Sequence, residues 1–351
     1  MSLFVDIKKD FGDFQLNVSF EAEPGVLGIL GASGCGKSMT LRCIAGIVTP
    51  DEGKICLNGV TLFDSEKRIN LPPQQRKVGL LFQNYALFPN MTVEQNVMCG
   101  IREERDRKRR RERTREMIRK MRLTGLEKHR PDALSGGQQQ RAALARILVG
   151  EPRLLMLDEP FSALDSYLRW QVEMELSDIL ADYGGTTLLV SHSRDEVYRL
   201  CDHVCVISEG TSQPVVPVRA LFEDPGTLDA ALLSGCKNYS RAKRTGPETV
   251  YAEDWGVELY CGKPVPEDMK FIGVRSHYVR AEGHINPIGC TVQRVVEDVF
   301  GTVVMLRPDG AAEGSEYGLI RVDIAKADWA AMGEPERLTI GLDPGDILLL
   351  K

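Results

Sequence analysis

Residues 31–38, Gly-Ala-Ser-Gly-Cys-Gly-Lys-Ser, constrain the fold of this chain more than any other stretch. They match G-x-x-x-x-G-K-[ST], the pattern of a phosphate-binding P-loop. Apolar residues 25–30 predict a buried strand entering the loop, and residues 38–45 predict a helix leaving it with its N-terminus toward the bound anion. The pattern therefore predicts a nucleoside triphosphate site on an α/β fold.

The loop positions have separate expected tasks. Glycines let the backbone turn so that successive N–H groups face a phosphate. Lys37 can then reach the β- and γ-phosphates, and the Ser38 hydroxyl can hold Mg²⁺. Cys35 either fills a variable position or is a site where alkylation or oxidation blocks nucleotide binding. The residues expected to contact the nucleotide are Gly31, Ala32, Ser33, Gly34, Cys35, Gly36, Lys37, Ser38 and Met39.

A second apolar run, Arg153-Leu-Leu-Met-Leu-Asp158-Glu159, ends in two acids. A P-loop enzyme needs a carboxylate near Mg²⁺, and Asp158 follows the strand that can deliver it. Glu159 is placed to orient or deprotonate an attacking water. Two acids after a strand can also form an ordinary turn, but their combination with a P-loop favours the catalytic interpretation.

Residues 134–138, Leu-Ser-Gly-Gly-Gln, precede a predicted helix at 139–149. Ser-Gly-Gly at a helix start is another exposed anion site. One domain would thus offer two phosphate-binding helix N-termini. This suggests that two chains pair head to tail and that each completes the other's nucleotide site.

The 351 residues are enough for two domains. Strand-like runs at 27–30, 78–82, 154–157, 187–190 and 204–207 are separated in several places by helical patterns, which predicts a mostly parallel sheet covered on both faces. Alternation over residues 4–20 predicts an antiparallel β edge. We expect a nucleotide-binding domain at 1–210 with a helical subdomain at about 84–150, a linker with a short helix at 211–239, and a β-rich domain, a small barrel, at 240–351.

Composition excludes several classes of protein. The net charge of −6 gives no reason to expect a nucleic-acid partner, and no apolar run approaches the ~20 residues that span a bilayer. Nine cysteines without a C-x₂-C pair argue against structural zinc. The charge run at 102–122 predicts a solvated helix face, with a lipid- or RNA-binding patch as the alternative. We expect a cytosolic protein that reaches a membrane through a partner.

Residues 134–138 resemble the signature sequence of ATP-binding cassette (ABC) ATPases, and further matches follow in the family's order. Gln83 resembles the Q-loop glutamine, residues 162–165 resemble the D-loop, and His192 resembles the switch histidine. Phe11 is similar to the aromatic residue that stacks on adenine. The resemblance covers residues 1 to about 210.

The resemblance implies ATP and Mg²⁺ as cofactors. Phe11 would stack on adenine, and Ser38, Gln83 and Asp158 would arrange Mg²⁺ directly or through water. Glu159 would act as the general base, with Lys37 and His192 at the γ-phosphate. The opposite protomer's site would be completed by Ser135, Gly136, Gly137, Gln138 and Asp165.

A single cassette most resembles the ATPase subunits of bacterial solute importers. That implies a homodimer at the cytoplasmic face of the cell membrane, with permease subunits as partners and a solute-binding protein acting indirectly. Residues 84–89, which contain Leu87 and Phe88, are predicted to be an exposed apolar set on which a short permease helix docks. The rival class is a soluble ABC ATPase of translation or DNA repair; a P-loop metabolite kinase is disfavoured by residues 134–138 and His192.

The β-rich tail resembles the oligomer-binding barrel of molybdate or tungstate importer ATPases through residues 271–275 and 290–351, and residues 64–73 and 76–79 add to that likeness. Sulfate, ferric iron, polyamine and sugar importers share the architecture. The tail either senses an oxyanion or only supports dimerisation. Candidate oxyanion contacts, chosen by residue type alone, are Arg275, Ser276, His277 and Lys326, although residue type favours surface solvation for each of them.

Overall fold

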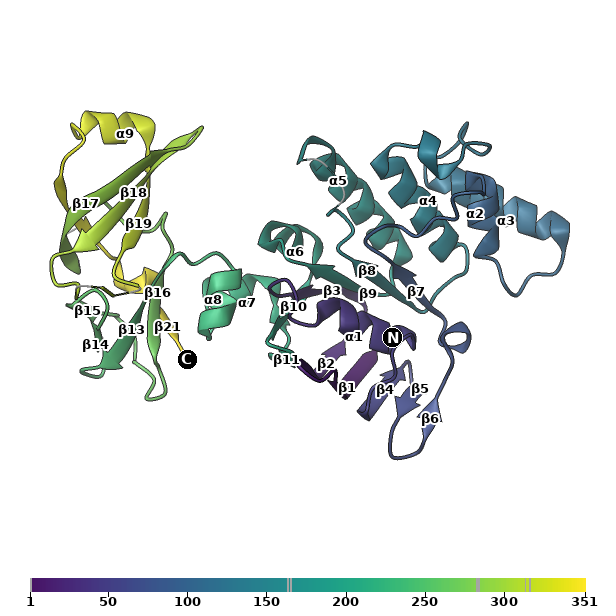
Figure 1. Ribbon diagram of the computed structural model, residues 1–351, viewed down its shortest axis with the longest axis horizontal. Helices are drawn as coiled ribbons and strands as arrows, with labels where there is room; N and C mark the ends of the chain where they lie inside the picture. Colours follow the sequence, from purple (N-terminus) through teal and green to yellow (C-terminus); the bar gives the residue numbers. More distant parts are fainter. Residues whose placement is uncertain (1, 163, 165, 282–284, 313, 316) are drawn as a thin grey trace. The chain divides into compact units, whose positions relative to one another are not determined.

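A computed structural model describes residues 2–162, 164, 166–281, 285–312, 314–315 and 317–351. The chain divides into two compact units, Met1–Val218 and Arg219–Lys351. Figure 1 shows the elements of each unit along the chain.

The first unit is built on one sheet with an antiparallel and a parallel part (Figure 1). The parallel strands follow the order β10-β3-β9-β8-β7, and the antiparallel strands follow the order β6-β5-β4-β1-β2. The antiparallel part comprises β1 (Leu3–Asp10), β2 (Gln15–Ala22), β4 (Glu52–Leu57), β5 (Val60–Asp64) and β6 (Ile69–Asn70). The parallel part comprises β3 (Gly25–Leu30), β7 (Val78–Leu81), β8 (Leu154–Asp158), β9 (Thr186–Ser191) and β10 (His203–Ser208). This confirms the predicted parallel sheet with an antiparallel β edge.

The helices cover the parallel strands on both faces. Alternate residues of β8 enter different cores, because side chains of a strand alternate between the two faces of its sheet. Leu154 and Met156 pack with the first helix and the antiparallel strands, whereas Leu155 and Leu157 pack with helices that follow later in the chain. The helices of this unit are α1 (Lys37–Ala45), α2 (Val93–Cys99), α3 (Arg107–Lys120), α4 (Gly136–Leu148), α5 (Ser166–Tyr183) and α6 (Arg194–Leu200), with 3₁₀ turns at Pro73–Gln75 and Pro131–Ala133.

Helices α2, α3 and α4 form a helical region with its own core of buried residues such as Val97, Ile118 and Ala142. Thr92 begins α2 with a capping box, since its hydroxyl accepts from the Gln95 amide and the Gln95 side chain accepts from the Thr92 amide. The charge run predicted at 102–122 contains α3, whose Thr114 and Ile118 are buried while most of its arginines are exposed.

The second unit is mainly β-structure around a large buried core that includes Trp255. Within the described residues its strands form two sheets, in the orders β15-β14-β13-β16-β21 and β19-β18-β17-β20. The separate β-rich domain is thereby confirmed. Its strands are β13 (Asn238–Arg244), β14 (Thr249–Ala252), β15 (Val257–Tyr260), β16 (Phe271–Val274), β17 (Pro287–Glu297), β18 (Gly301–Pro308), β19 (Ile320–Ala325), β20 (Arg337–Gly341) and β21 (Leu348–Leu350). Its helices are α7 (Val218–Glu223), which begins at the last residue of the first unit, α8 (Leu228–Leu233) and α9 (Lys326–Ala331), with a 3₁₀ turn at Pro344–Asp346.

The segment expected to be a linker, residues 211–239, is shared between the units. Strands β11 (Thr211–Ser212) and β12 (Val216–Pro217) pair with β10, so they extend the sheet of the first unit. Residues from 219 onward belong to the second unit, where Leu228 donates a backbone hydrogen bond to Lys351. The division between compact units therefore falls at residue 218, because backbone pairing occupies both ends of this segment.

Candidate nucleotide-binding site

The P-loop lies between β3 and α1, where the sequence predicts it. Gly36 precedes α1 with a φ of 106°, a left-handed conformation that favours glycine. A Cβ atom on Gly31 would lie 2.3 Å from the Ile207 carbonyl oxygen, so the backbone passes closer there than any side chain allows. Lys37 is buried, and its Nζ donates to the carbonyls of Gly31 and Ala32 at 2.8 Å each. The loop is therefore a tight turn that carries a buried cation.

Asp158 meets Ser38 at the start of α1. The Ser38 hydroxyl donates to Asp158 Oδ1 at 2.7 Å. Burial raises the pKa of the Asp158 carboxyl, and the bond from Ser38 and the charge of Lys37 oppose that rise. A hydroxyl and a carboxylate at hydrogen-bond distance form an oxygen donor pair suited to Mg²⁺.

Gln83, Glu159 and His192 converge beside that pair. Gln83 Nε2 lies 3.5 Å from Glu159 Oε2, and His192 Nδ1 lies 3.4 Å from Glu159 Oε1. The three residues follow β7, β8 and β9, neighbouring parallel strands whose carboxyl ends share one edge of the sheet. Glu159 has a φ of 45°, which is uncommon outside glycine, and its amide donates to the Val190 carbonyl. The sheet edge thus gathers three polar side chains that are separate in sequence.

Phe11 is connected to the P-loop through a second aromatic residue, Phe14. Its ring lies 6.2 Å from the Phe14 ring, and its amide donates to the Phe14 carbonyl. Phe14 in turn lies 3.0 Å from where a Cβ atom on Gly36 would be. Phe11 is 38% exposed, and Lys9 Nζ lies 6.0 Å from its ring centroid, so the ring is partly accessible near the loop. No sequence pattern predicts a role for Phe14, because its role depends on this packing.

Ser135 begins α4 through a capping box. Its hydroxyl accepts from the Gln138 amide, and its own amide donates to Gln138 Oε1 at 2.9 Å. Gly136 and Gly137 pack closely against α5 and the segment before it, since Cβ atoms there would lie 2.8 Å from Leu164 and 3.1 Å from Val172. The helix start is rigidly formed on an element separate from the strand ends that carry the P-loop and its acids. Asp165 lies outside the described residues.

The segment after Gln83 is less exposed than its sequence predicts. Tyr85 is buried and donates from its hydroxyl to the Pro160 carbonyl, and Leu87 is half-buried, so only part of the expected apolar set faces solvent. Phe88 is exposed and lies under the Arg146 guanidinium, 5.2 Å from the ring centroid. Arg146 also donates to the carbonyls of Ala86 and Tyr85. No sequence pattern predicts the role of Arg146, which reaches this segment from α4.

A cavity of about 660 Å³ opens beside this segment. Its lining contains apolar side chains from the sheet and the helical region, and it also contains arginines. Residues at its lining include Leu80, Phe82, Phe88, Ile101, Arg113 and Arg146. The cavity can accept a short amphipathic element.

The four oxyanion candidates of the second unit each have another contact. Arg275 is buried and donates to the carbonyls of Ser234 and Phe222, while Ser276 donates to Asp323. The His277 ring packs on Tyr278, and Lys326 lies 3.7 Å from Glu297. The polar groups of Arg275 and Ser276 are therefore engaged by other groups of the second unit.

Together, the strand–loop–helix with a buried lysine and the acids at the sheet edge define a P-loop nucleotide-binding domain. Two solved structures show the same fold with 26% sequence identity and a TM-score of 0.52, covering 62% of this chain and 99% of theirs. One is the ATP-binding cassette MJ0796 in a dimeric post-hydrolysis state bound to ADP and phosphate. None of the described helices combines the length and apolar character needed to cross a membrane.

The ABC transporter family model matches residues 16–162. The spermidine/putrescine import ATP-binding protein PotA of Vibrio vulnificus is 35% identical over 322 residues, which cover 86% of this chain and 83% of that relative. This chain belongs to the ABC transporter family.

Other relatives are named for different solutes. The PotA protein of Methylococcus capsulatus is 41% identical over 70% of this chain, and the match spans 63% of that relative's length. The sulfate/thiosulfate import protein CysA 2 of Chromobacterium violaceum is 37% identical over 80% of this chain and 76% of its own length. The molybdenum import protein ModC of Paramagnetospirillum magneticum is also 37% identical, over 64% of this chain and 61% of its own.

Proposed function

We propose that this chain is the ATP-hydrolysing subunit of a bacterial ABC importer. The observation that carries the proposal is the convergence of Gln83, Glu159 and His192 beside the Ser38–Asp158 pair. Acids and amides placed there can bind a hydrated cation and orient a water toward a γ-phosphate. The relatives named as import ATP-binding proteins support the transport assignment.

In this proposal the P-loop backbone from Gly31 to Gly36 and Lys37 bind the phosphates, Met39 contacts the nucleotide from the first turn of α1, and Phe11 stacks on adenine. Ser38, Asp158 and Gln83 hold Mg²⁺, which would neutralise phosphate charge when bound. Glu159 removes the proton from the attacking water, and His192 contacts the γ-phosphate. Mg²⁺ fits because the pair at the site offers oxygen atoms 2.7 Å apart.

The Glu159→Gln variant tests the proposed base. We expect it to retain ATP and to lose turnover by about 10²–10⁴-fold, because the amide cannot accept the proton. ATP should then hold the variant as a dimer, measured by light scattering. Glu116→Gln, an exposed substitution on α3, is the matched control and should turn over ATP normally. Wild-type turnover in Glu159→Gln would show that the base is misassigned.

We further propose that Ser135 to Gln138, with Asp165, complete the nucleotide site of a second copy. This follows from the position of the Ser135 capping box, on a helix start separate from the strand ends. Two defective variants, Lys37→Ala and Ser135→Arg, test it by mixing. A head-to-tail heterodimer would contain one intact site, so the mixture should regain about a quarter of wild-type turnover when the sites act independently. Turnover no higher than the mean of the two variants would refute the shared site.

A permease is proposed to dock at the cavity beside Phe88, from the cytoplasmic face of the membrane. The apolar lining and the exposed Phe88 ring suit one face of a short permease helix. Phe88→Asp should therefore abolish co-purification with the permease while basal ATP turnover stays normal. Leu87 is a poor test because it packs in two hydrophobic cores. Intact co-purification of Phe88→Asp would refute this site.

For the solute we propose molybdate or tungstate, with sulfate, ferric iron, polyamines or sugar as the alternatives. The tail pattern supports an oxyanion, while relatives named for spermidine/putrescine, sulfate/thiosulfate and molybdenum support three solutes equally. Uptake of labelled molybdate, sulfate and spermidine by cells lacking this chain distinguishes them. A loss confined to spermidine uptake would reject the oxyanion. A solute-binding protein would deliver the solute to the permease from outside.

A further inference from the structure

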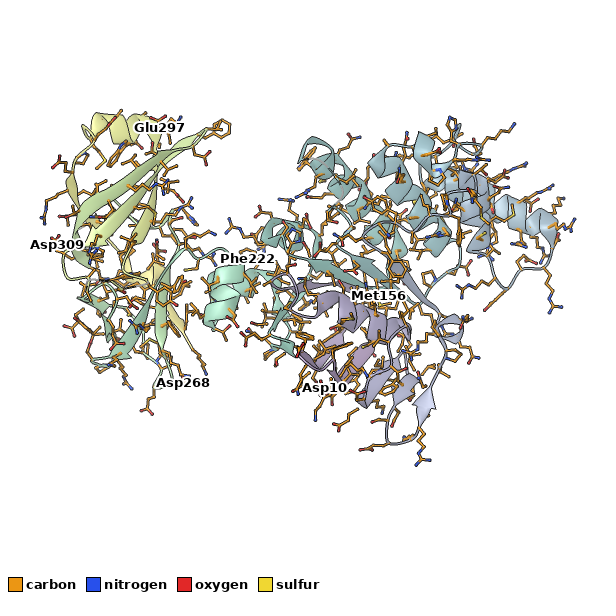
Figure 2. The ribbon with its side chains drawn as sticks, viewed as in Figure 1. Asp10, Met156, Phe222, Asp268, Glu297 and Asp309 are labelled. Atoms are coloured by element: carbon orange, nitrogen blue, oxygen red, sulfur yellow. The ribbon has the colours of Figure 1, made fainter. Side chains whose placement is uncertain are left out.

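The hairpin formed by β17 and β18 in the second unit has an end that lacks a neighbour on one side. Strand β17 pairs with β18 from Cys290 to Glu297, but β20 pairs only with residues 287–291 of β17. Among the strand pairings of the described residues, residues 294–297 therefore form a free edge. Figure 1 shows the hairpin, and Figure 2 labels Glu297 near its end.

Two apolar side chains are exposed on this free edge, between the exposed charged residues Arg294 and Glu297. Val295 and Val296 are 41% and 40% exposed, and the turn residues Val299 and Phe300 are 74% and 93% exposed. Native proteins usually protect an edge strand with charges, prolines or a covering element, because an apolar edge pairs readily with another strand. Two adjacent valines beside an exposed Phe-containing turn are a surface suited to strand pairing.

The backbone at this edge is oriented for such pairing. The Asp298 amide donates to the Gly301 carbonyl at 2.9 Å, which closes a two-residue turn. Residues of an antiparallel strand alternate in the side to which they direct their N–H and C=O groups. Val296, two residues before Asp298, directs these groups toward β18. Val295 and Glu297 therefore direct theirs away from β18, toward the free side.

We propose that this edge pairs antiparallel with the same edge of a second copy, with the two-fold axis at Val296. A two-fold axis normal to a sheet keeps each side chain on its own face, so symmetric pairing can join only residues an even number of positions apart. With Val296 opposite itself, Arg294 lies opposite the partner subunit's Asp298, and Val295 lies opposite the partner subunit's Glu297. Val295 and Glu297 then exchange backbone hydrogen bonds across the axis.

Charge complementarity favours a second copy of this chain as the partner and favours this register. The symmetric dimer contains two contacts in which Arg294 of one copy faces Asp298 of the other. Opposite charges that face each other across a strand pair are favourable. Centring the axis on Val295 would instead place Asp298 opposite Val292, leaving the charges unmatched. Glu297 keeps Lys326 of its own chain 3.7 Å away, so it brings no unpaired charge to the contact. This contact requires no nucleotide, so it goes beyond the ATP-dependent pairing proposed above.

Cysteine cross-linking of the full chain, without nucleotide, tests the register. Opposed residues that do not exchange backbone hydrogen bonds have Cα atoms about 4.5 Å apart, within disulfide range. Val296→Cys should therefore form a covalent dimer on mild oxidation. Val295→Cys is the matched control. In the proposed register, residue 295 and the same residue of the second copy are offset by two positions, so their Cα atoms lie about 8 Å apart, beyond disulfide range. Equal cross-linking of both variants, or cross-linking of Val295→Cys alone, would overturn the proposal. Absence of a covalent dimer in both variants would overturn it as well.

A charge exchange tests the partner. Arg294→Asp and Asp298→Arg should each weaken nucleotide-free dimerisation about tenfold in sedimentation, because like charges then face each other twice. The double variant Arg294→Asp/Asp298→Arg should restore wild-type affinity. A double variant as weak as the single ones would overturn the proposal, and so would a wild-type chain that stays monomeric at high micromolar concentration. Both outcomes leave the ATP-trapped dimer of Glu159→Gln unaffected, so failure of this contact and failure of the proposed function are distinguishable.

Discussion

Replacing Arg76 by Met should loosen the helix that carries the P-loop. Arg76 is 1% exposed and lies behind α1, where its guanidinium donates to the carbonyls of Cys43 and Ile44 at 2.9 and 2.8 Å. It also donates to the Leu71 carbonyl and to Asn70 Oδ1. The last carbonyls of a helix have no partner within the helix, so Arg76 serves as a side-chain cap for the end of α1.

The size of the effect follows from these bonds. A buried carbonyl left without a donor costs about 1–3 kcal/mol, and each lost bond to a charged group about 1.5–3 kcal/mol. The Cys43 carbonyl keeps the Gly46 amide as a second donor, which limits its loss. Burial lowers the pKa of Arg76, which shows that the buried charge itself is unfavourable, and Met removes that cost. We therefore expect Arg76→Met to destabilise the first unit by about 3 kcal/mol.

Hydrogen exchange measured by mass spectrometry is the suitable assay, because two units need not unfold together. Amides of α1 and β4 should lose about 3 kcal/mol of protection, while amides of β17 and β18 should keep theirs and serve as an internal control. Arg107→Met, an exposed substitution on α3, should change protection by less than 0.5 kcal/mol, the level typical of exposed sites. A loss below about 1 kcal/mol in α1 would refute the capping argument.

Three further changes have outcomes that the structure specifies. Burial raises the pKa of Asp254, but hydrogen bonds led by Arg241 outweigh it and bring the pKa to about 2; because this lies below the unfolded value of about 3.9, the stabilisation is complete above about pH 4 and is lost as the pH falls through 2. Asp254→Asn should remove this acid dependence in near-UV circular dichroism, and an unchanged acid transition would contradict it. Cys35→Ser should bind ATP normally yet resist inactivation by N-ethylmaleimide, because the Cys35 sulfur lies 3.9 Å from the P-loop lysine; equal inactivation of both proteins would exclude this thiol. Arg146→Met should increase hydrogen exchange of residues 84–88, since two carbonyls there lose their donor; unchanged exchange would show that the loop is held by other contacts.

The strand ends of the site could be predicted from sequence because the strands are continuous apolar runs. Buried parallel strands need apolar residues on both faces, so β8 and β9 are recognisable, and the polar residues directly after them, Glu159 and His192, are placed by that fact alone. The P-loop adds a glycine pattern with a fixed geometry. The strand positions predicted from these local patterns agree with the structure for every strand of the parallel part of the sheet.

Long-range contacts set the limit of the sequence analysis. Arg146 reaches Ala86 across 60 positions, and nothing near either residue signals that contact. Arg275 has the charge of an oxyanion ligand, but its guanidinium is occupied by carbonyls of α7 and the end of α8, which residue type cannot reveal. The free edge of β17 likewise depends on where β20 begins, a matter of register between strands far apart in the chain.

The proposed division of the nucleotide site between two copies agrees with the topology of the sheet. Parallel strands β3, β7, β8 and β9 deliver the P-loop, Gln83, Glu159 and His192 to one edge, because their carboxyl ends coincide. Ser135 arrives differently, at the start of a helix reached through the helical region between β7 and β8. A phosphate held at the strand edge is thus flanked by polar groups on one side. In the proposed head-to-tail dimer, the Ser135 helix start of the second copy approaches that phosphate without any change in the fold.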